Sequence, residues 1–109
     1  MTKDTSSYTA IYEAGIALPG TLYLLQQLNE RGPLRNRDLM NKDVYNNPPA
    51  LSYRLKKAHK GGLIDRNVTN IPGEQPIITY SINEYGRKAL KKAEELEAIL
   101  QEAKSKVKK

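Results

Sequence analysis

The segment from Asn46 to Gly62 constrains the fold more than any other part of the chain. Its sequence, NNPPALSYRLKKAHKGG, contains four Lys or Arg residues and no acid. At about 100° per residue, its apolar side chains share one side of a helix and most of its basic ones point away. The apolar positions are Leu51, Leu55 and Ala58, and the outer positions are Pro49, Tyr53, Lys56, Lys57 and Lys60. We therefore predict a short helix that packs on one side and is cationic on the other.

The ends of this helix are also marked in the sequence. Asn47 can cap the first turn, and Pro48 suits the first helical position, where no backbone donor is needed. The pair Gly61-Gly62 supplies a glycine of the kind with which many helices end. The predicted helix therefore covers residues 48–60.

Three helices are predicted before the basic helix. Residues 8–16 form the first, with Ser6 or Ser7 as its cap, and the leucine-rich residues 21–31 form the second. A brief third helix occupies residues 37–41. Pro-Gly and Gly-Pro pairs flank the second helix and separate it from its neighbours.

After the double glycine, the apolar pattern changes from the period of a helix to that of a strand. Residues 63–69 and 77–82 predict two strands, and the turn-rich residues 70–76 join them as a hairpin. Residues 84–107 predict a long C-terminal helix, in which Gly86 costs about 1 kcal/mol relative to alanine. We expect close packing of this helix on the hairpin to explain the glycine.

This order of elements resembles the winged helix-turn-helix regulators, in which the hairpin is the wing. Two matches carry the resemblance. LSYRLKKAHKGGLIDR, at Leu51–Arg66, looks like a recognition helix followed by the Gly-Leu-Ile-x-Arg entry to the wing. YSINEYGRKAL, at Tyr80–Leu90, resembles the Tyr-x-Leu-Thr-x-x-Gly-Arg pattern at the wing exit. In these two matches and in the order of its elements, the chain is similar to the MarR, HxlR and PadR families. The resemblance covers roughly residues 20–90 and implies an α+β, mostly α fold with a two-stranded wing and a long C-terminal dimerisation helix.

The length of 109 residues allows one domain with a single modest core. We expect one winged-helix domain over residues 1–109, with its core at about 18–83 and the dimerisation helix at about 84–107. Eighteen Lys and Arg against twelve Asp and Glu give a formal net charge of +6, which favours a polyanionic partner. Double-stranded DNA is therefore the predicted partner.

Several classes of protein are not expected. The sequence has no cysteine, no glycine-rich phosphate loop and no Ser/His/Asp set, so we expect no enzyme, no metal and no cofactor. Its single histidine, His59, is expected to be structural. No apolar run approaches the ~18 residues of a membrane span, and we expect a cytoplasmic, nucleoid-associated protein.

The basic helix is the predicted DNA-reading element. Lysine lacks the bidentate fork that reads guanine, so the lysines are expected at phosphates and Asn47, Ser52 and Tyr53 at base edges. Arg54 lies on a flank and is open to either role. Arg66 is open between a phosphate contact and a salt bridge with a neighbouring acid. The predicted DNA-binding residues are Arg35, Arg37, Asn47, Ser52, Tyr53, Arg54, Lys56, Lys57, Lys60 and Arg66.

The wing departs from the family pattern. Wings of these regulators usually carry Lys or Arg near the tip, where the side chain enters the minor groove. Here Pro72, Gly73 and Glu74 form the tip, and no cation lies between Asn67 and Ile82. We therefore expect no cationic contact from the wing tip.

The C-terminal helix carries the only long apolar seam, which begins at Leu90 and is interrupted where Glu97 takes one heptad position. Soluble proteins rarely leave an apolar stripe of this length exposed to water, so a second chain is expected to cover it. We therefore predict a homodimer in which the seam contacts the partner's C-terminal helix and short N-terminal helix. The predicted dimer residues are Tyr8, Ile11, Tyr12, Leu96, Ile99, Leu100, Ala103 and Val107.

These features predict a homodimeric, sequence-specific double-stranded DNA-binding protein that acts as a transcriptional repressor. A first alternative is a DNA-organising protein that spreads along DNA, in chromatin architecture or plasmid partition. The Lys-rich face and the lysines near the C-terminus favour that alternative. A second alternative is a winged helix used as a protein–protein interaction module.

Overall fold

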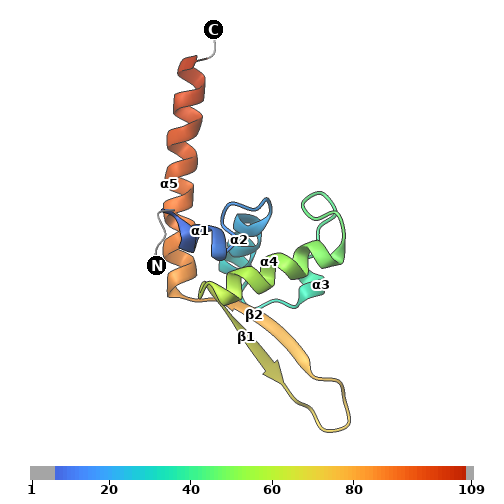
Figure 1. The fold of residues 1–109 in the computed structure, drawn as a ribbon. Helices are drawn as coiled ribbons and strands as arrows, with labels where there is room; N and C mark the ends of the chain where they lie inside the picture. Colours follow the sequence, from blue (N-terminus) through green and yellow to red (C-terminus); the bar gives the residue numbers. More distant parts are fainter. Residues whose placement is uncertain (1–6, 108–109) are drawn as a thin grey trace.

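The computed structural model describes residues 7–107, and this part of the chain forms five helices and one two-stranded sheet. Figure 1 shows the hairpin and the end of the last helix projecting from the body in different directions. The architecture is the predicted one, an α+β and mostly α winged helix-turn-helix. In chain order the elements are α1 (Thr9–Glu13), α2 (Thr21–Arg31), α3 (Asn36–Leu39), α4 (Pro48–Lys60), β1 (Ile64–Thr69), β2 (Ile77–Ile82) and α5 (Glu84–Val107).

The core forms between α2 and α4, with the start of the hairpin and of α5 closing it. Leu51, Leu55 and Ala58 are each at most 1% exposed, which confirms the predicted apolar side of α4. At roughly 1.5–3 kcal/mol for a fully buried leucine, these contacts fix the rotation of α4 about its own axis. The other core residues are Ala14, Leu24, Leu25, Leu28, Leu39, Tyr45, Leu63, Ile64 and Leu90.

Both ends of α4 carry the predicted caps. The side-chain oxygen of Asn47 accepts a hydrogen bond from the amide of Ala50 at 2.9 Å. At the other end, Gly62 has a φ of +83°, a left-handed conformation that favours glycine. The amides of Gly62 and Leu63 each donate to a carbonyl of the last turn at 3.0 Å. The chain therefore leaves α4 in a Schellman motif that directs it into the wing.

The wing is an antiparallel hairpin held at its base. Ile64 pairs with Ile82 at the body end of the hairpin. Leu34, from the loop before α3, adds a bridge to Tyr80 with backbone hydrogen bonds of 3.0 and 2.8 Å. Only the first residue of β1 is buried, so the outer part of the hairpin projects from the body.

The first helix is shorter than predicted. It ends at Glu13, because Gly15 has a φ of +81° and a right-handed helix cannot continue through that conformation. A Cβ at Gly15 would lie 3.0 Å from the Cβ of Lys57, so the chain turns here against α4. The N-cap is Tyr8 instead of a serine, and Ser6 lies outside the described residues. The third helix also ends early, at Leu39, where the backbone becomes extended.

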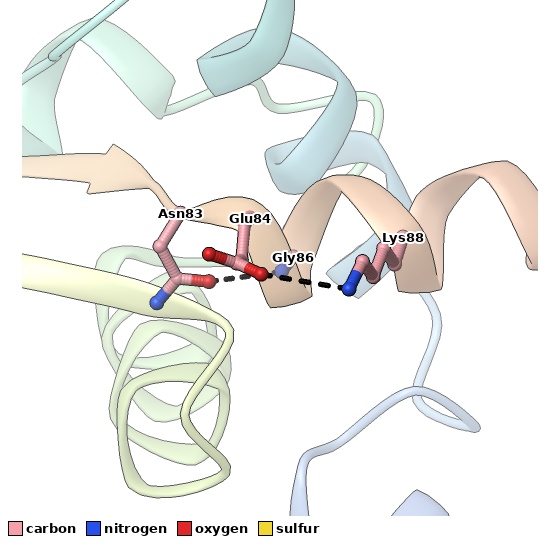
Figure 2. A network of polar contacts seen from close by, with 4 residues as sticks. All are labelled: Asn83, Glu84, Gly86 and Lys88. Atoms are coloured by element: carbon pink, nitrogen blue, oxygen red, sulfur yellow. Dashed lines mark hydrogen bonds and ion pairs between the residues drawn. The ribbon is translucent and has the colours of Figure 1, made fainter.

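Figure 2 shows the polar contacts that begin α5. The side-chain oxygen of Asn83 accepts a hydrogen bond from the amide of Gly86 at 2.9 Å, as an N-cap does. The amide nitrogen of the same side chain donates to the carbonyl of Gly62 at 2.9 Å. Glu84 and Lys88 form an exposed ion pair at 3.5 Å, one turn apart. Asn83 thus ties the start of α5 to the end of α4.

Gly86 lies buried where α5 crosses the hairpin, as predicted. A Cβ at this position would overlap the carbonyl oxygen of Leu63 and would lie 2.6 Å from the Cγ1 of Ile82. The glycine is therefore required by the close approach of two backbones, even though it weakens the helix.

Replacing Gly86 with alanine should lower the free energy of unfolding. An exposed helical position would gain about 1 kcal/mol from this change. Here we expect a net loss of about 1–3 kcal/mol, because the added methyl group overpacks a contact with backbone. Urea denaturation followed by circular dichroism measures the difference, with Lys91→Ala on the exposed side of α5 as the control. A Gly86→Ala variant as stable as the parent would contradict the packing described above.

Candidate nucleic-acid interface

The outer face of α4 is exposed and cationic. Lys56 and Lys60 are exposed, and Tyr53 is 50% exposed. Lys57 is half-buried, and its Nζ lies 5.8 Å from the centroid of the Tyr53 ring, within the range of a cation–π contact. The burial of the opposite side of the helix holds this face outward, as the sequence predicted.

Arg54, which the sequence left open between two roles, is held against the protein. Its Nε donates to the carbonyl of Pro19 at 2.9 Å, and its Nη1 donates to the carbonyl of Ala50 at 3.0 Å. The first of these bonds joins residues 35 positions apart and fixes the loop before α2 onto α4. Arg54 therefore has a clear role in holding α4 against the loop before α2.

A buried tyrosine also binds this loop, through the residue that follows Pro19. The hydroxyl of Tyr45 donates to the carbonyl of Gly20 at 2.7 Å, and its ring packs edge-on against that of Tyr23. Burial raises the pKa of Tyr45 to about 12, with a further rise from Tyr23 that Arg54 opposes. The phenol therefore remains a neutral hydrogen-bond donor at physiological pH. The loop before α2 is thus held by Tyr45, which precedes α4, and by Arg54, which belongs to α4.

Two of the three predicted base-reading residues have partners within the protein. The side-chain oxygen of Asn47 caps α4, so its amide nitrogen is the group left to reach outward. The Oγ of Ser52 accepts a hydrogen bond from the Nδ2 of Asn36 at 3.3 Å. Tyr53 is 50% exposed on the outer face of α4, and its ring lies beside Lys57.

A cleft of about 340 Å³ lies between α4 and the wing. It brings three of the predicted residues, Ser52, Lys56 and Arg66, together with His59. His59, for which the sequence predicted a structural role, is exposed and lines this cleft. Its spacing of three residues from Lys56 was a signal in the sequence. The full lining is Asn36, Ser52, Leu55, Lys56, His59, Arg66 and Tyr80.

A second cleft, of about 650 Å³, lies between α1 and α4. Here Glu13 of α1 lies alongside the lysines of α4 and provides a carboxylate at the edge of the basic face. No local pattern in the sequence indicated this proximity, since it depends on how the chain turns back after α1. The lining residues are Ala10, Glu13, Tyr53, Lys56, Lys57, Lys60 and Gly61.

Arg35 and Arg37 lie away from the outer face of α4. They line a shallow cleft with residues 74–78 of the wing, including Glu74. Arg37 is exposed, whereas Arg35 is half-buried and its backbone amide donates to the carboxylate of Asp38 at 3.1 Å. The predicted residues therefore fall into a central group on α4, Arg66 at the base of the wing, and these two arginines near its tip.

The part of the chain covered by residues 7–107 contains no group of three or more His, Cys, Asp or Glu side chains that could hold a metal ion. Within the same residues, no helix is long and apolar enough to cross a membrane.

Comparison with solved structures identifies the fold of the chain. No protein-family model and no curated protein matches the chain. One solved structure is described as a transcriptional regulator of the MarR family from Enterococcus faecalis V583. It shares 27% identity with this chain, and the match covers 97% of this chain and 93% of that protein, with a TM-score of 0.66. The HTH-type transcriptional regulator ytcD shares 24% identity over 92% of this chain and 99% of its own, with a TM-score of 0.67. The transcriptional regulator TA0346 from Thermoplasma acidophilum shares 19% identity with this chain. The match covers 86% of this chain and 91% of TA0346, with a TM-score of 0.66. The chain is a winged helix-turn-helix protein.

Proposed function

We propose that this protein binds double-stranded DNA as a homodimer and acts as a sequence-specific transcriptional repressor. The observation that carries the proposal is the exposed cationic face of α4, held outward by complete burial of the opposite side and flanked by a projecting wing. The fold is shared with proteins described as transcriptional regulators, one of them of the MarR family, which supports the same function. The site of action would be the nucleoid, with residues 1–109 acting as one winged-helix domain.

In this proposal α4 lies in the major groove. Lys56, Lys57 and Lys60 neutralise phosphates and release condensed counterions, which supplies affinity for any sequence. Tyr53, with Asn47 and Ser52 beside it, contacts base edges or thymine methyl groups and supplies the preference for a sequence. Arg35, Arg37 and Arg66 contact the backbone on either side. Arg54 is assigned to positioning, because two of its donors are engaged within the protein.

Replacing Lys56, Lys57 and Lys60 with alanine should weaken binding to all duplexes and flatten its salt dependence. The slope of log affinity against log salt should fall by ~0.9 for each phosphate contact removed. Fluorescence anisotropy with a labelled duplex at several salt concentrations measures the slope. The matched control removes three exposed lysines from α5, which are Lys88, Lys91 and Lys92.

The triple variant on α4 and the control on α5 change the net charge equally. A general effect of net charge would lower both slopes by the same amount, and the assignment of α4 to the interface would then be wrong. A folded triple variant with an unchanged slope would exclude this helix from DNA contact.

The proposed dimer uses the exposed apolar stripe of α5. Leu90 is only 5% exposed and belongs to the protomer core, so the stripe left for a partner begins at Ala93 and includes Leu96 instead of Glu97. Its intervals alternate between three and four residues, which is the repeat of a coiled-coil seam without a polar interruption. The stripe consists of Ala93, Leu96, Leu100, Ala103 and Val107.

Within residues 7–107, the stripe is left largely exposed from Leu96 onward. Leu96 and Leu100 are more than half exposed, and Figure 1 shows this part of the helix extending beyond the body. Ile99 beside them, and Tyr8, Ile11 and Tyr12 around α1, are also exposed. We propose that the α1 residues of each protomer pack on the partner's α5, which extends the coiled-coil contact.

Replacing Leu100 with glutamate should dissociate the dimer, because the charge would be buried in the centre of the seam. Sedimentation velocity should show a monomer that remains folded by circular dichroism. Its affinity for a two-half-site duplex should fall much more than its affinity for a single half-site. Ser105→Glu places the same charge on a different side of α5 and should remain dimeric. A dimeric Leu100→Glu variant would place the interface elsewhere.

A second candidate function is a DNA-organising protein that spreads along DNA. It is favoured by the choice of lysine over arginine on the outer face of α4 and by a wing tip that carries Glu74 and no cation. The lysines favour phosphate contact over base readout, and the wing tip adds no cation that could contact the minor groove.

DNase footprinting at increasing protein concentration should separate the two functions. A repressor should protect a bounded site, about one helical turn between half-site centres, or ~34 Å. The protected region should then stop growing once the site is filled. A footprint that lengthens steadily with concentration would support spreading and contradict the repressor.

A further inference from the structure

The cleft between α4 and the wing is lined by hydrogen-bond donors and cations from four elements. Lys56 and His59 come from α4 and Arg66 comes from β1. Asn36 of α3, Ser52 of α4 and Tyr80 of β2 complete the polar lining, and none of the residues that line the cleft is acidic. The cleft therefore has the chemistry of an anion site, in contrast to the cleft beside α1, which contains Glu13.

The geometry of a duplex gives this cleft a defined occupant. A helix in the major groove and a hairpin beside it over the adjacent minor groove lie on opposite sides of one sugar–phosphate strand. The strand that separates the two grooves must therefore pass between α4 and the wing. The cleft lies at that place, at the base of the hairpin, where Arg66 pairs with Tyr80.

We propose that this cleft binds one backbone phosphate of the DNA, and that His59 contacts the phosphate through its protonated imidazole. The inference rests on the proposed DNA binding and adds to it a residue and a dependence on pH. A phosphate oxygen placed between α4 and β1 meets Lys56 and Arg66 from two sides and the imidazole from the last turn of α4. A neutral imidazole donates one hydrogen bond, whereas a protonated one also attracts the phosphate charge.

The sign of the pH effect follows from the charge of the ligand. A phosphate favours the protonated form of a neighbouring histidine, so the complex binds more protons than the free protein. DNA affinity should therefore rise as pH falls. The other polar and charged groups that line the cleft with the imidazole are Lys56, Arg66, Tyr80 and the neutral Asn36 and Ser52. Among the groups that line the cleft, only an imidazole ordinarily titrates between pH 5.5 and 8.5, because lysine, arginine and tyrosine side chains titrate well above pH 8.

The test measures affinity for a short labelled duplex at constant ionic strength between pH 5.5 and 8.5. For the parent protein, we expect binding to tighten by roughly 3- to 10-fold from pH 8 to pH 6, because protonation of the imidazole adds an attraction to the phosphate. His59→Gln should bind weakly with no dependence on pH. His59→Arg should bind tightly with no dependence on pH, because its charge is permanent.

A second measurement uses the fact that the chain contains a single histidine. The imidazole Cε1–H resonance of the untagged protein reports the protonation of His59 directly. Its titration midpoint should move to higher pH when the duplex is added. DNA binding without that shift, or a His59→Gln variant with the parent's pH dependence, would overturn the inference. Absence of DNA binding at every pH would instead overturn the proposed function.

Discussion

The contact between the apolar side of α4 and the core determines what the rest of the surface can do. Leu51, Leu55 and Ala58 are fully buried, and a rotation of the helix by one residue, about 100°, would turn lysines into the core. Burial of these three side chains therefore also fixes which residues point outward. The caps at Asn47 and Gly62 fix where the helix begins and ends, so the outer face has a defined length as well as a defined direction.

The rest of the fold holds α4 in place through contacts that connect its two ends to distant segments. Arg54 binds the loop before α2, and Asn83 binds the carbonyl of Gly62 at the end of α4. Gly86 then allows α5 to approach the carbonyl of Leu63, directly after the Schellman motif. As a result, the wing and the long C-terminal helix both leave the body beside the short stretch that ends α4. The position of α4 relative to a second protomer would depend on that stretch.

Elements with strong local signals could be predicted from the sequence. The basic helix was predicted with its bounds, because an apolar period, an N-cap asparagine and a glycine pair all lie within it or beside it. The two strands were predicted because the period changes at Gly62. The close packing at Gly86 was inferred from a glycine in a helical pattern. In each case, the evidence lies within a few residues of the feature.

Features that depend on distant segments could not be predicted in the same way. The early end of α1 results from a turn at Gly15 against Lys57, more than forty positions later in the chain. The positioning role of Arg54 requires the carbonyl of Pro19, and the place of His59 in a cleft requires the wing to fold back beside α4. A helical wheel gives the direction of a side chain but not the neighbour that it meets.

The distribution of charge limits how this surface can recognise DNA. The positive side chains lie on α4, at the base of the wing and on α3, whereas the wing tip has a carboxylate and no cation. A winged helix of this kind would obtain little attraction from the minor groove beyond the wing base, so one protomer would have few contacts with which to bind tightly. Two copies joined through α5 would double those contacts and restrict their spacing, which one α4 helix cannot do. The long exposed seam and the absence of a cation at the wing tip are therefore consistent parts of one mode of recognition, in which the pairing of recognition helices would replace the contact of the wing tip.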